Sequence, residues 1–524
     1  MMSRRYLYLA VFTSGMTSLA VELSASRLLG NIYGTSNLVW ANVIGLMLIY
    51  LTVGYFIGGR WADRSPQYTT FYKIMLWAAF LCGLIPLIAR PILTAVASAV
   101  NDLDNLSGME AGLALGSFGS ILILFSVPVT LLGCVSPFAI RLAIKDADDA
   151  GTVSGNIYAI STLGSIVGTF TPVLFAIPAL GTTRTFLLYA GLLFGVALGG
   201  YLLTTRRLDA RLLLMPLSIG LLSAIILNGP MRPAPDHMRL LYEKDSAYNL
   251  IQIVEDERDG MRYLLLNEGQ GYHSQWHPEQ VYFQRTWGYF LIGPYFNASP
   301  YTPDDVQNIA IIGLAGGTIA RQYTAVYGDI PIDGIEIDGE IIEASRKYLG
   351  MTMPNLNVII QDGRYAFNQL DKRYSVVGID AYRVPYVPWH LTTVEFFEEI
   401  RDKLTDNGVV VINVGRTPSD RRLVDAMANT MLHVFPTVHA MDVPNSLNTI
   451  LVATRQPTVE TNLADNFALL DRVTYPILGD ALETATQTLV PVTPSKTLFT
   501  DDHAPVEQII DSMVIDYLLN RNTP

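Results

Sequence analysis

Cysteine is scarce in this sequence of 524 residues, which has 2 cysteines, Cys82 and Cys134, both in apolar stretches. Their number and setting exclude a disulfide framework and a cysteine-rich metal site. The 7 histidines all follow position 236 and show no ligand spacing, so we predict no metal centre. Basic residues are outnumbered as well, because 35 Lys and Arg stand against 47 Asp and Glu, which gives a net charge of −12. An acidic chain repels phosphate backbones, and we therefore expect no nucleic acid among its partners.

Charged residues amount to only 16% of the chain, whereas hydrophobic residues amount to 50% and the mean hydropathy is +0.31. This is too apolar for an ordinary soluble enzyme. Residues 1–228 hold 13 Lys and Arg against 9 Asp and Glu, and the remaining residues hold 22 against 38. We therefore expect a membrane domain at 1–228 and a strongly acidic soluble part, which would attract a cationic substrate such as a polyamine.

Seven apolar runs in the first 228 residues are each close to the ~20 residues that a helix needs to cross a bilayer. They occupy residues 6–25, 38–57, 71–89, 111–132, 157–176, 185–203 and 212–227. The sequence thus predicts an α-helical bundle of about seven transmembrane helices, to within one span, with the lipid bilayer as its partner.

Ionisable residues and glycines inside these runs carry further expectations. Glu22 and Arg27 are costly in or beside a span, so we expect an ion pair between them, with a transport or ligand role as the alternative. The glycines within 54–59 and 164–168 predict close helix packing. The run 59–64 resembles a short loop motif of major-facilitator transporters, although seven spans are too few for that fold.

Basic residues are concentrated in alternate loops. The N-terminus and the second, fourth and sixth loops carry ten positive charges, whereas the other loops carry Arg27, Arg90 and Arg184. The positive-inside rule places the N-terminus in the cytoplasm, and seven spans would put the soluble part outside. One span more or fewer reverses that face, so it is left open.

A proline-rich linker is expected at residues 229–240, where Pro230, Pro233 and Pro235 favour an extended chain. A small β module is expected at 241–300, because its strand-like runs flank the turn 257–260, which is a hairpin signal. Residues 301–524 form the last expected domain, an α/β domain of the Rossmann-like class.

The stretch 308–415 organises this last domain. Residues 309–312 form a short apolar run typical of a buried parallel strand, a glycine-rich turn follows at 313–318, and residues 319–327 look helical. A glycine-rich turn between a strand and a helix is the context in which nucleotide binding is expected.

Acids or glycine follow each of the next three predicted strands, namely Glu336 and Asp338, then Asp362 and Gly363, then Asp380. In a doubly wound sheet the carboxyl ends of the strands line one crevice, and an acid about 20 residues after the glycines binds the two hydroxyls of a ribose. The pattern predicts a nucleoside site. The alternative is that these glycines and acids are ordinary loop and surface residues between the strands of a sheet.

These motifs resemble the spermidine synthase family, which has the S-adenosylmethionine-dependent methyltransferase fold, and are most similar to its membrane-fused bacterial and archaeal branch. The resemblance covers about residues 240–510, and the membrane part resembles that branch too. It implies an adenosyl ligand, decarboxylated S-adenosylmethionine or S-adenosylmethionine, with Glu336 at the ribose and Asp362 at the adenine amino group. The ligand-binding residues that it implies are Gly313, Ala315, Gly317, Glu336, Asp338, Asp362, Gly363, Tyr282 and Gln284. For Tyr282, a packing role is an equal alternative.

The acceptor side departs from the family pattern. The family's Asp-Ser-x-Asp-Pro loop reads Asp380-Ala381-Tyr382-Arg383-Val384-Pro385. The resemblance makes Asp380 the catalytic base, whereas Arg383 replaces the acid that anchors the polyamine. Gly316 replaces the acid that holds the donor's amino group. Nucleoside recognition therefore looks intact and polyamine recognition degraded.

Other acceptor-side residues follow from two further resemblances. Tyr248 lies in a Ser-x-Tyr-Asn run similar to the family's Ser-x-Tyr-Gln signature, and Tyr382 follows the catalytic acid. The run 500–507 resembles a terminal motif of the membrane-fused branch, and it contributes Asp501, Asp502, His503 and Glu507. Helix capping by Asp501 or Asp502 is the alternative for that motif.

Three hypotheses for function follow. The leading one is a membrane-anchored spermidine synthase-like protein that binds an adenosyl ligand and transfers an aminopropyl or related group to an acceptor other than the usual polyamine. The second is a catalytically degenerate binding or assembly module, with a homodimer or membrane complex as partner. The third is a transporter with a sensing domain.

Overall fold

The computed structural model describes residues 4–33, 37–102, 109–207, 209–227, 229–267, 269, 271–382 and 387–520. Contacts divide the chain into two compact units. The first is helical and comprises residues 1–107, 111–233 and 245–250, and the second comprises residues 108–110, 234–244 and 251–524.

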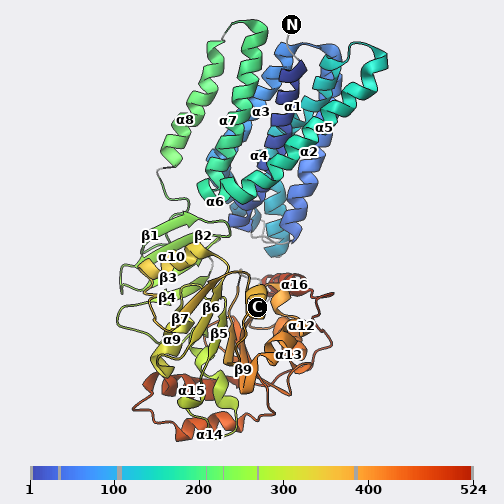
Figure 1. Cartoon of the computed structure of the whole chain (residues 1–524). Helices are drawn as coiled ribbons and strands as arrows, with labels where there is room; N and C mark the ends of the chain where they lie inside the picture. The colour runs from blue at the N-terminus through green and yellow to red at the C-terminus, as the bar shows by residue number, and fades with distance from the viewer. Residues whose placement is uncertain are drawn as a thin grey trace. The chain divides into compact units, whose positions relative to one another are not determined.

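Long apolar helices build the first unit (Figure 1). They are α1 (Arg4–Tyr33), α2 (Asn37–Arg64), α3 (Tyr68–Asp102), α4 (Met109–Ala143), α5 (Ala150–Thr171) and α7 (Thr182–Thr205), and a π-helical turn joins α5 to the short α6 (Ile177–Leu180). Within the described ranges, 6 helices are long and apolar enough to cross a membrane, as predicted for the first six runs. The seventh run forms a shorter apolar helix, Ala210–Ile226, which includes α8 (Leu214–Ile226).

Glycines bring α5 against α1. A Cβ atom at Gly164 would lie 2.1 Å from the carbonyl oxygen of Phe12, and one at Gly168 would lie 2.0 Å from that of Met16. Any side chain at these two positions therefore forces the helices apart. The predicted role of the 164–168 glycines in helix packing is confirmed.

The predicted ion pair between Glu22 and Arg27 is wrong. Arg27 Nη2 donates to Asp245 Oδ1 at 3.0 Å and to the carbonyl oxygen of Ser246 at 2.5 Å. The backbone N–H of Thr182, at the start of α7, donates to Asp245 Oδ2 at 2.9 Å. No local pattern indicates this pair, because its partners are 218 residues apart.

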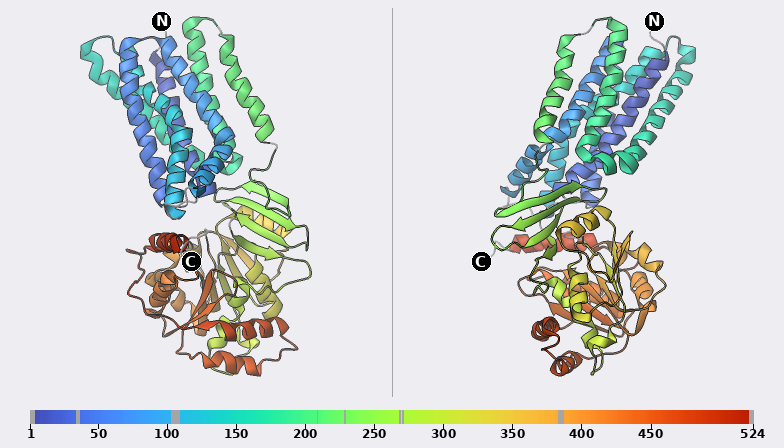
Figure 2. Two further views of the ribbon diagram at one scale, coloured as in Figure 1. Left: turned by 180° about the vertical axis from the view of Figure 1, so that it is seen from behind. Right: turned by 60° about the vertical axis from the view of Figure 1, so that its left-hand side comes forward.

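An antiparallel sheet of four strands opens the second unit (Figure 2). Its strands are β1 (Met238–Asp245), β2 (Leu250–Asp256), β3 (Arg262–Leu266) and β4 (Tyr272–Trp276). β2 and β3 pair with Ile251 opposite Leu266, which confirms the predicted hairpin. β1 begins inside the range expected for the linker. Apolar residues of β2 and β3 pack on α10 (Gly339–Tyr348) through Ile341 and Ala344.

The main sheet contains eight strands among the described residues, in the order β12-β10-β11-β9-β8-β5-β6-β7. They are β5 (Ile309–Ile312), β6 (Ile332–Glu336), β7 (Leu356–Ile360), β8 (Tyr374–Ile379), β9 (Leu404–Gly415), β10 (Thr437–Asp442), β11 (Asn448–Thr454) and β12 (Leu489–Val490). β5 to β9 are parallel, whereas β11 lies antiparallel between β9 and β10. This is the topology of a methyltransferase-type Rossmann-like domain, as predicted.

Helices cover both faces of this sheet (Figure 1). One face packs against α9 (Thr318–Tyr327), α14 (Thr461–Leu469) and α15 (Pro476–Thr488). The other packs against α11 (Gly363–Asn368), α12 (Val394–Asp402), α13 (Arg422–Leu432) and α16 (Val506–Asn520). Because both faces are covered, the parallel strands are mostly apolar, and the binding edge is the one at which they end.

The glycine contact between α5 and α1 leads to a matched test. We expect Gly168→Ala to destabilise the detergent-solubilised chain by ~1–3 kcal/mol, because its methyl group must displace backbone. Gly155→Ala on the same helix is the control, since nothing lies within 4 Å of a Cβ atom there. Thermal unfolding measures both, and equal melting temperatures for the two variants would contradict the packing.

Candidate functional site

The glycine-rich turn after β5 has an unusual backbone. Gly313, Ala315 and Gly317 have φ angles of +90°, +46° and +75°, in the left-handed region that favours glycine. A Cβ atom at Gly313 would lie 2.6 Å from the backbone nitrogen of Ala381 and the carbonyl oxygen of Asp380. The turn therefore sits directly against the end of β8, where Asp380 begins the next loop.

Glu336, at the end of β6, holds this turn from the other side. Its Oε2 accepts a hydrogen bond from the Ala315 backbone N–H at 2.9 Å, and its Oε1 accepts one from the Asp338 backbone N–H at 3.1 Å. Burial raises the pKa of the Glu336 carboxyl from 4.5 to about 7, and these backbone hydrogen bonds oppose the rise. A carboxylate has about four lone-pair positions, so each oxygen keeps capacity for a second donor, such as a ribose hydroxyl.

The acids after β6 and β7 both cap helices. Asp338 is buried and accepts a hydrogen bond from the Glu340 backbone N–H at 3.1 Å, at the start of α10. Asp362 accepts one from the Tyr365 backbone N–H at 3.0 Å, at the start of α11. Its other oxygen lies 3.4 Å from His390 Nε2, and 43% of its side chain is exposed. Asp362 is thus accessible, whereas Asp338 is turned to its own helix.

The position of Gly316 is closed to any side chain. The Gly316 backbone N–H donates to Ser274 Oγ of β4 at 2.7 Å. A Cβ atom there would lie 2.6 Å from Ser274 Cβ and 2.7 Å from Leu349 Cδ1. The family pattern has an acid at this position. Here Ser274 and Leu349 leave no room for any side chain, so the difference from the family is larger than the loss of one carboxylate.

Neutral donors surround Asp380. Asn413 Nδ2, near the end of β9, donates to Asp380 Oδ1 at 2.9 Å, and Trp287 also donates a hydrogen bond to this carboxyl. Asn413 is oriented in turn by Asn448, whose Nδ2 donates to Asn413 Oδ1 at 2.8 Å. Burial raises the pKa of Asp380 from 3.8 to about 7, and the donors from Asn413 and Trp287 oppose the rise. A carboxyl with this pKa exchanges a proton near neutral pH.

Tyr382 lies on the same side of the site. Its hydroxyl donates to the carbonyl oxygen of Asn413 at 3.1 Å, and burial raises the pKa of that hydroxyl, with the Asp380 charge adding to the effect. Tyr382 and Asp380 therefore share Asn413 as a support. Arg383, expected next to them, lies outside the described residues.

Three other predicted residues lie elsewhere or face solvent. Tyr282 packs against Gly288 and forms a hydrogen bond with Thr484 of α15, which agrees with its packing alternative. Gln284 is exposed. Tyr248 belongs to the first unit, where 47% of it is exposed.

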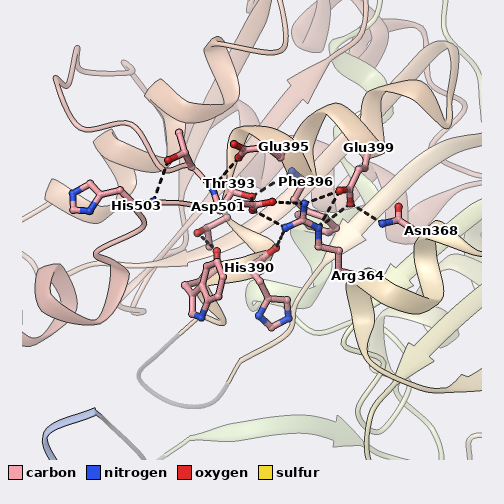
Figure 3. Close-up of polar contacts among 12 residues, drawn as sticks. Arg364, Asn368, His390, Thr393, Glu395, Phe396, Glu399, Asp501 and His503 are labelled. Atoms are coloured by element: carbon pink, nitrogen blue, oxygen red, sulfur yellow. Dashed lines mark hydrogen bonds and ion pairs between the residues drawn. The ribbon is translucent and has the colours of Figure 1, made fainter.

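The terminal motif forms a polar network in which Asp501 is central (Figure 3). Its carboxylate binds Arg364 of α11 at 2.7 and 2.9 Å and accepts from Thr393 Oγ1 at 2.7 Å. Asp502 and His503 are exposed, and Glu507 lies in the first turn of α16. Four residues of this motif were expected on the acceptor side. One of them, Asp501, binds Arg364 and Thr393 instead, and the role of the other three stays a prediction.

Sequence reasoning missed the residues that hold this site together. Arg364, Trp287 and Asn448 carry no motif, and their partners lie 26 to 137 positions away in the sequence. Asn413 at the end of the fifth parallel strand had a signal, since polar residues at strand ends line the crevice. Within the described residues, no group of His, Cys, Asp or Glu is arranged to hold a metal ion.

Comparison with known proteins finds similarity in part of the second unit. A family model, the spermine/spermidine synthase domain, matches residues 301–463. A "Probable polyamine aminopropyl transferase" of Bifidobacterium longum is 28% identical over 248 residues, which is 43% of this chain and 55% of that protein. A polyamine aminopropyltransferase of Vibrio vulnificus is 27% identical over 215 residues, which is 39% of this chain and 68% of that protein. The chain thus spans about half of the Bifidobacterium relative.

Solved structures with similar folds include a probable spermidine synthase from Corynebacterium glutamicum, at 20% identity and a TM-score of 0.38, covering 51% of this chain and 100% of that one. A spermidine synthase in complex with the transition-state analogue AdoDATO has 21% identity and a TM-score of 0.34, covering 43% of this chain and 75% of that one. The family match and the sheet topology agree. The chain therefore carries a spermine/spermidine synthase domain, preceded by helices that are apolar enough to cross a membrane.

Proposed function

We propose that this chain is a membrane-anchored, spermidine synthase-like protein that binds an adenosyl ligand and transfers an aminopropyl or related group to an acceptor other than the usual polyamine. The observation that carries the proposal is the carboxylate of Glu336. Two backbone N–H groups at 2.9 and 3.1 Å fix its oxygens beside the glycine-rich turn. A carboxylate held in this way is preorganised for the two hydroxyls of a ribose.

The pairing of two acids with arginines favours an acceptor that is not a polycation. Asp442, at the end of β10, lies 2.7 Å from Arg421 and 3.3 Å from Arg416, so its charge is matched by two guanidinium groups. Asp501 is held by Arg364. A polyamine needs carboxylates that are free to pair with its ammonium groups, because desolvating an ammonium without a partner is costly. Of Asp380, Asp442 and Asp501, Asp380 is the one whose described donors are all neutral, and they come from Asn413 and Trp287.

Asp380 is the group that we propose as general base. When bound, the sulfonium ligand supplies an electrophilic carbon and leaves as a neutral thioether. Asp380 takes the proton from the attacking nucleophile, for which its pKa of about 7 is well matched at neutral pH. Asn413 and Trp287 orient the carboxylate, and the Tyr382 hydroxyl supports Asn413 by donating a hydrogen bond to its carbonyl oxygen.

A feature of the helical unit favours a second candidate, a membrane-tethered binding or assembly module without catalysis. α8 runs beside α3, since Ile219 lies 3.6 Å from the Cβ position of Gly83 and Arg90 Nη1 donates to the carbonyl oxygen of Pro230 at 3.4 Å. Tyr6 of α1 lies beside Tyr72, near the start of α3, with ring centroids 6.2 Å apart. Residue 230, beside Arg90, therefore lies toward the end of the bundle opposite the N-terminus. With the N-terminus in the cytoplasm, that end faces outward, away from adenosyl donors made inside the cell.

Reporter fusions at the C-terminus discriminate between the two candidates. A reporter that is active only outside the cytoplasm supports the binding module, whereas a reporter that is active only in the cytoplasm contradicts it. A fusion at the N-terminus is the matched control, because the loop charges predict that this end is cytoplasmic under both candidates.

Ligand binding is the first test of the transferase proposal. Calorimetry of the full chain in detergent with S-adenosylmethionine, its decarboxylated form and methylthioadenosine should give binding below millimolar for at least one of them. If none binds below millimolar, no adenosyl ligand is recognised and the enzyme proposal fails.

Glu336→Gln should weaken that binding about 10- to 100-fold, because a hydrogen bond to a charged acceptor contributes roughly 1.5–3 kcal/mol. Its amide group also faces one of the two backbone N–H donors, so a small loss of stability is expected. Glu343→Gln, which removes an exposed acid of α10, is the control. Equal affinities of the two variants for methylthioadenosine would exclude Glu336 from the binding site.

Asp380→Asn should keep ligand affinity and reduce the transfer rate ~10²- to 10⁴-fold. The wild-type rate should rise as the pH passes about 7, since the base acts only when deprotonated, and the variant should lose that rise. Stability gives a second readout. Because the folded-state pKa lies above 3.8, the wild type loses stability as the pH rises from about 4 to 7, and the variant should lose less. A variant that matches wild type in both profiles would refute the role of Asp380.

A further inference from the structure

The turn Thr500–His503 closes on itself and contacts α12 of the same unit. Thr500 and His503 exchange backbone hydrogen bonds at 3.0 Å, which presents Asp501 at the tip of the turn. The Asp501 backbone N–H donates to Glu395 Oε2 at 3.0 Å, and the Asp501 side chain accepts from Thr393 at the cap of α12. The turn is thus attached to α12 at two points.

Arg364 is the partner that makes this attachment specific. Its Nη1 and Nη2 bind both oxygens of Asp501, and its Nε and Nη2 bind Glu399 of α12 at 2.6 to 3.1 Å. The remaining N–H donates to the carbonyl oxygen of His390 at 3.2 Å. All five donors of the guanidinium are therefore used, and its contacts with Asp501, Glu399 and His390 can be followed in Figure 3. Only 17% of the side chain is exposed.

These contacts join two segments of the binding edge. Arg364 lies two residues after Asp362, the accessible acid at the end of β7, and its bond to His390 holds the short turn Trp389–Leu391. His390 Nε2 in turn faces Asp362 at 3.4 Å. The turn 389–391 is where the chain returns from the Asp380 loop to α12, so the guanidinium ties that return to the Asp362 turn.

We propose that Asp501 and Arg364 form a clasp that positions the Asp362 turn and the segment 387–393 for the adenosyl ligand. The inference rests on the proposed function for its ligand, but the clasp itself can be observed without one. It assigns the terminal motif a positioning role, in place of direct contact with the acceptor.

The charges around Arg364 allow a positioning role of Asp501 to be separated from simple charge pairing. Hydrogen bonds from Arg364 and Thr393 lower the pKa of Asp501, and Asp501 and Glu399 raise the pKa of Arg364. The guanidinium nevertheless has two carboxylates bound to it, so removing one charge leaves the cation paired. What Asp501→Asn removes is the two-point geometry, because one carboxylate oxygen becomes an amide donor that faces an Arg364 donor.

Asp501→Asn is tested against Asp502→Asn, which removes the same charge from the exposed neighbouring position of the same turn. Arg364→Lys is the second variant, since it keeps the charge and loses the planar fork. Hydrogen–deuterium exchange of the full chain without ligand should speed up in residues 362–368 and 387–393 for Asp501→Asn and Arg364→Lys. Asp502→Asn should match wild type.

Methylthioadenosine affinity is measured on the same samples by calorimetry. We expect about a tenfold loss for Asp501→Asn and for Arg364→Lys, with no further loss in the double variant because both act through one contact. Unchanged exchange, or equal changes in Asp502→Asn, would overturn the clasp. Faster exchange with wild-type affinity would overturn its positioning role. If wild type binds no adenosyl ligand, the exchange result still decides whether the clasp exists, while the proposed function fails separately.

Discussion

The hydrogen bond between the Glu336 carboxylate and the Ala315 backbone N–H is the contact on which the rest of the site depends. It holds a left-handed turn in place, and that turn lies against the backbone of Asp380. The same carboxylate is therefore both the support of the loop and the group proposed to bind the ligand. Ser274 of β4 also binds this turn, through the backbone N–H of Gly316. The turn 313–317 therefore contacts β4, the end of β6 and the end of β8.

The sequence predicted the parallel strands of the main sheet because they are mostly apolar runs that end at a glycine or a polar residue. The predicted strand 309–312 agrees with β5 at both ends, and the hairpin around 257–260 was also correct. Periodicity carries this information, since buried parallel strands are apolar on both faces. The long helices of the first unit were also predicted from apolar runs, although the seventh run forms a shorter helix than the others.

Pairings between side chains that are distant in the chain could not be predicted from the sequence. Arg27 was expected to pair with Glu22 five positions away, but its partner is Asp245. Asp501 was expected at the acceptor, but Arg364, 137 positions away, binds it. The sequence identified which acids end the strands, but it gave no information about which basic groups neutralise them. That second property decides whether an acid is available to a substrate.

The central claim is that the edge beside the glycine-rich turn binds an adenosyl ligand through Glu336. An electron cryomicroscopy structure of the full chain in a lipid nanodisc with methylthioadenosine tests it most directly. The account predicts both ribose hydroxyls within hydrogen-bond distance of the two Glu336 oxygens, with the adenine beside Asp362. A ligand bound at any other place, with Glu336 contacting only the backbone, would contradict it.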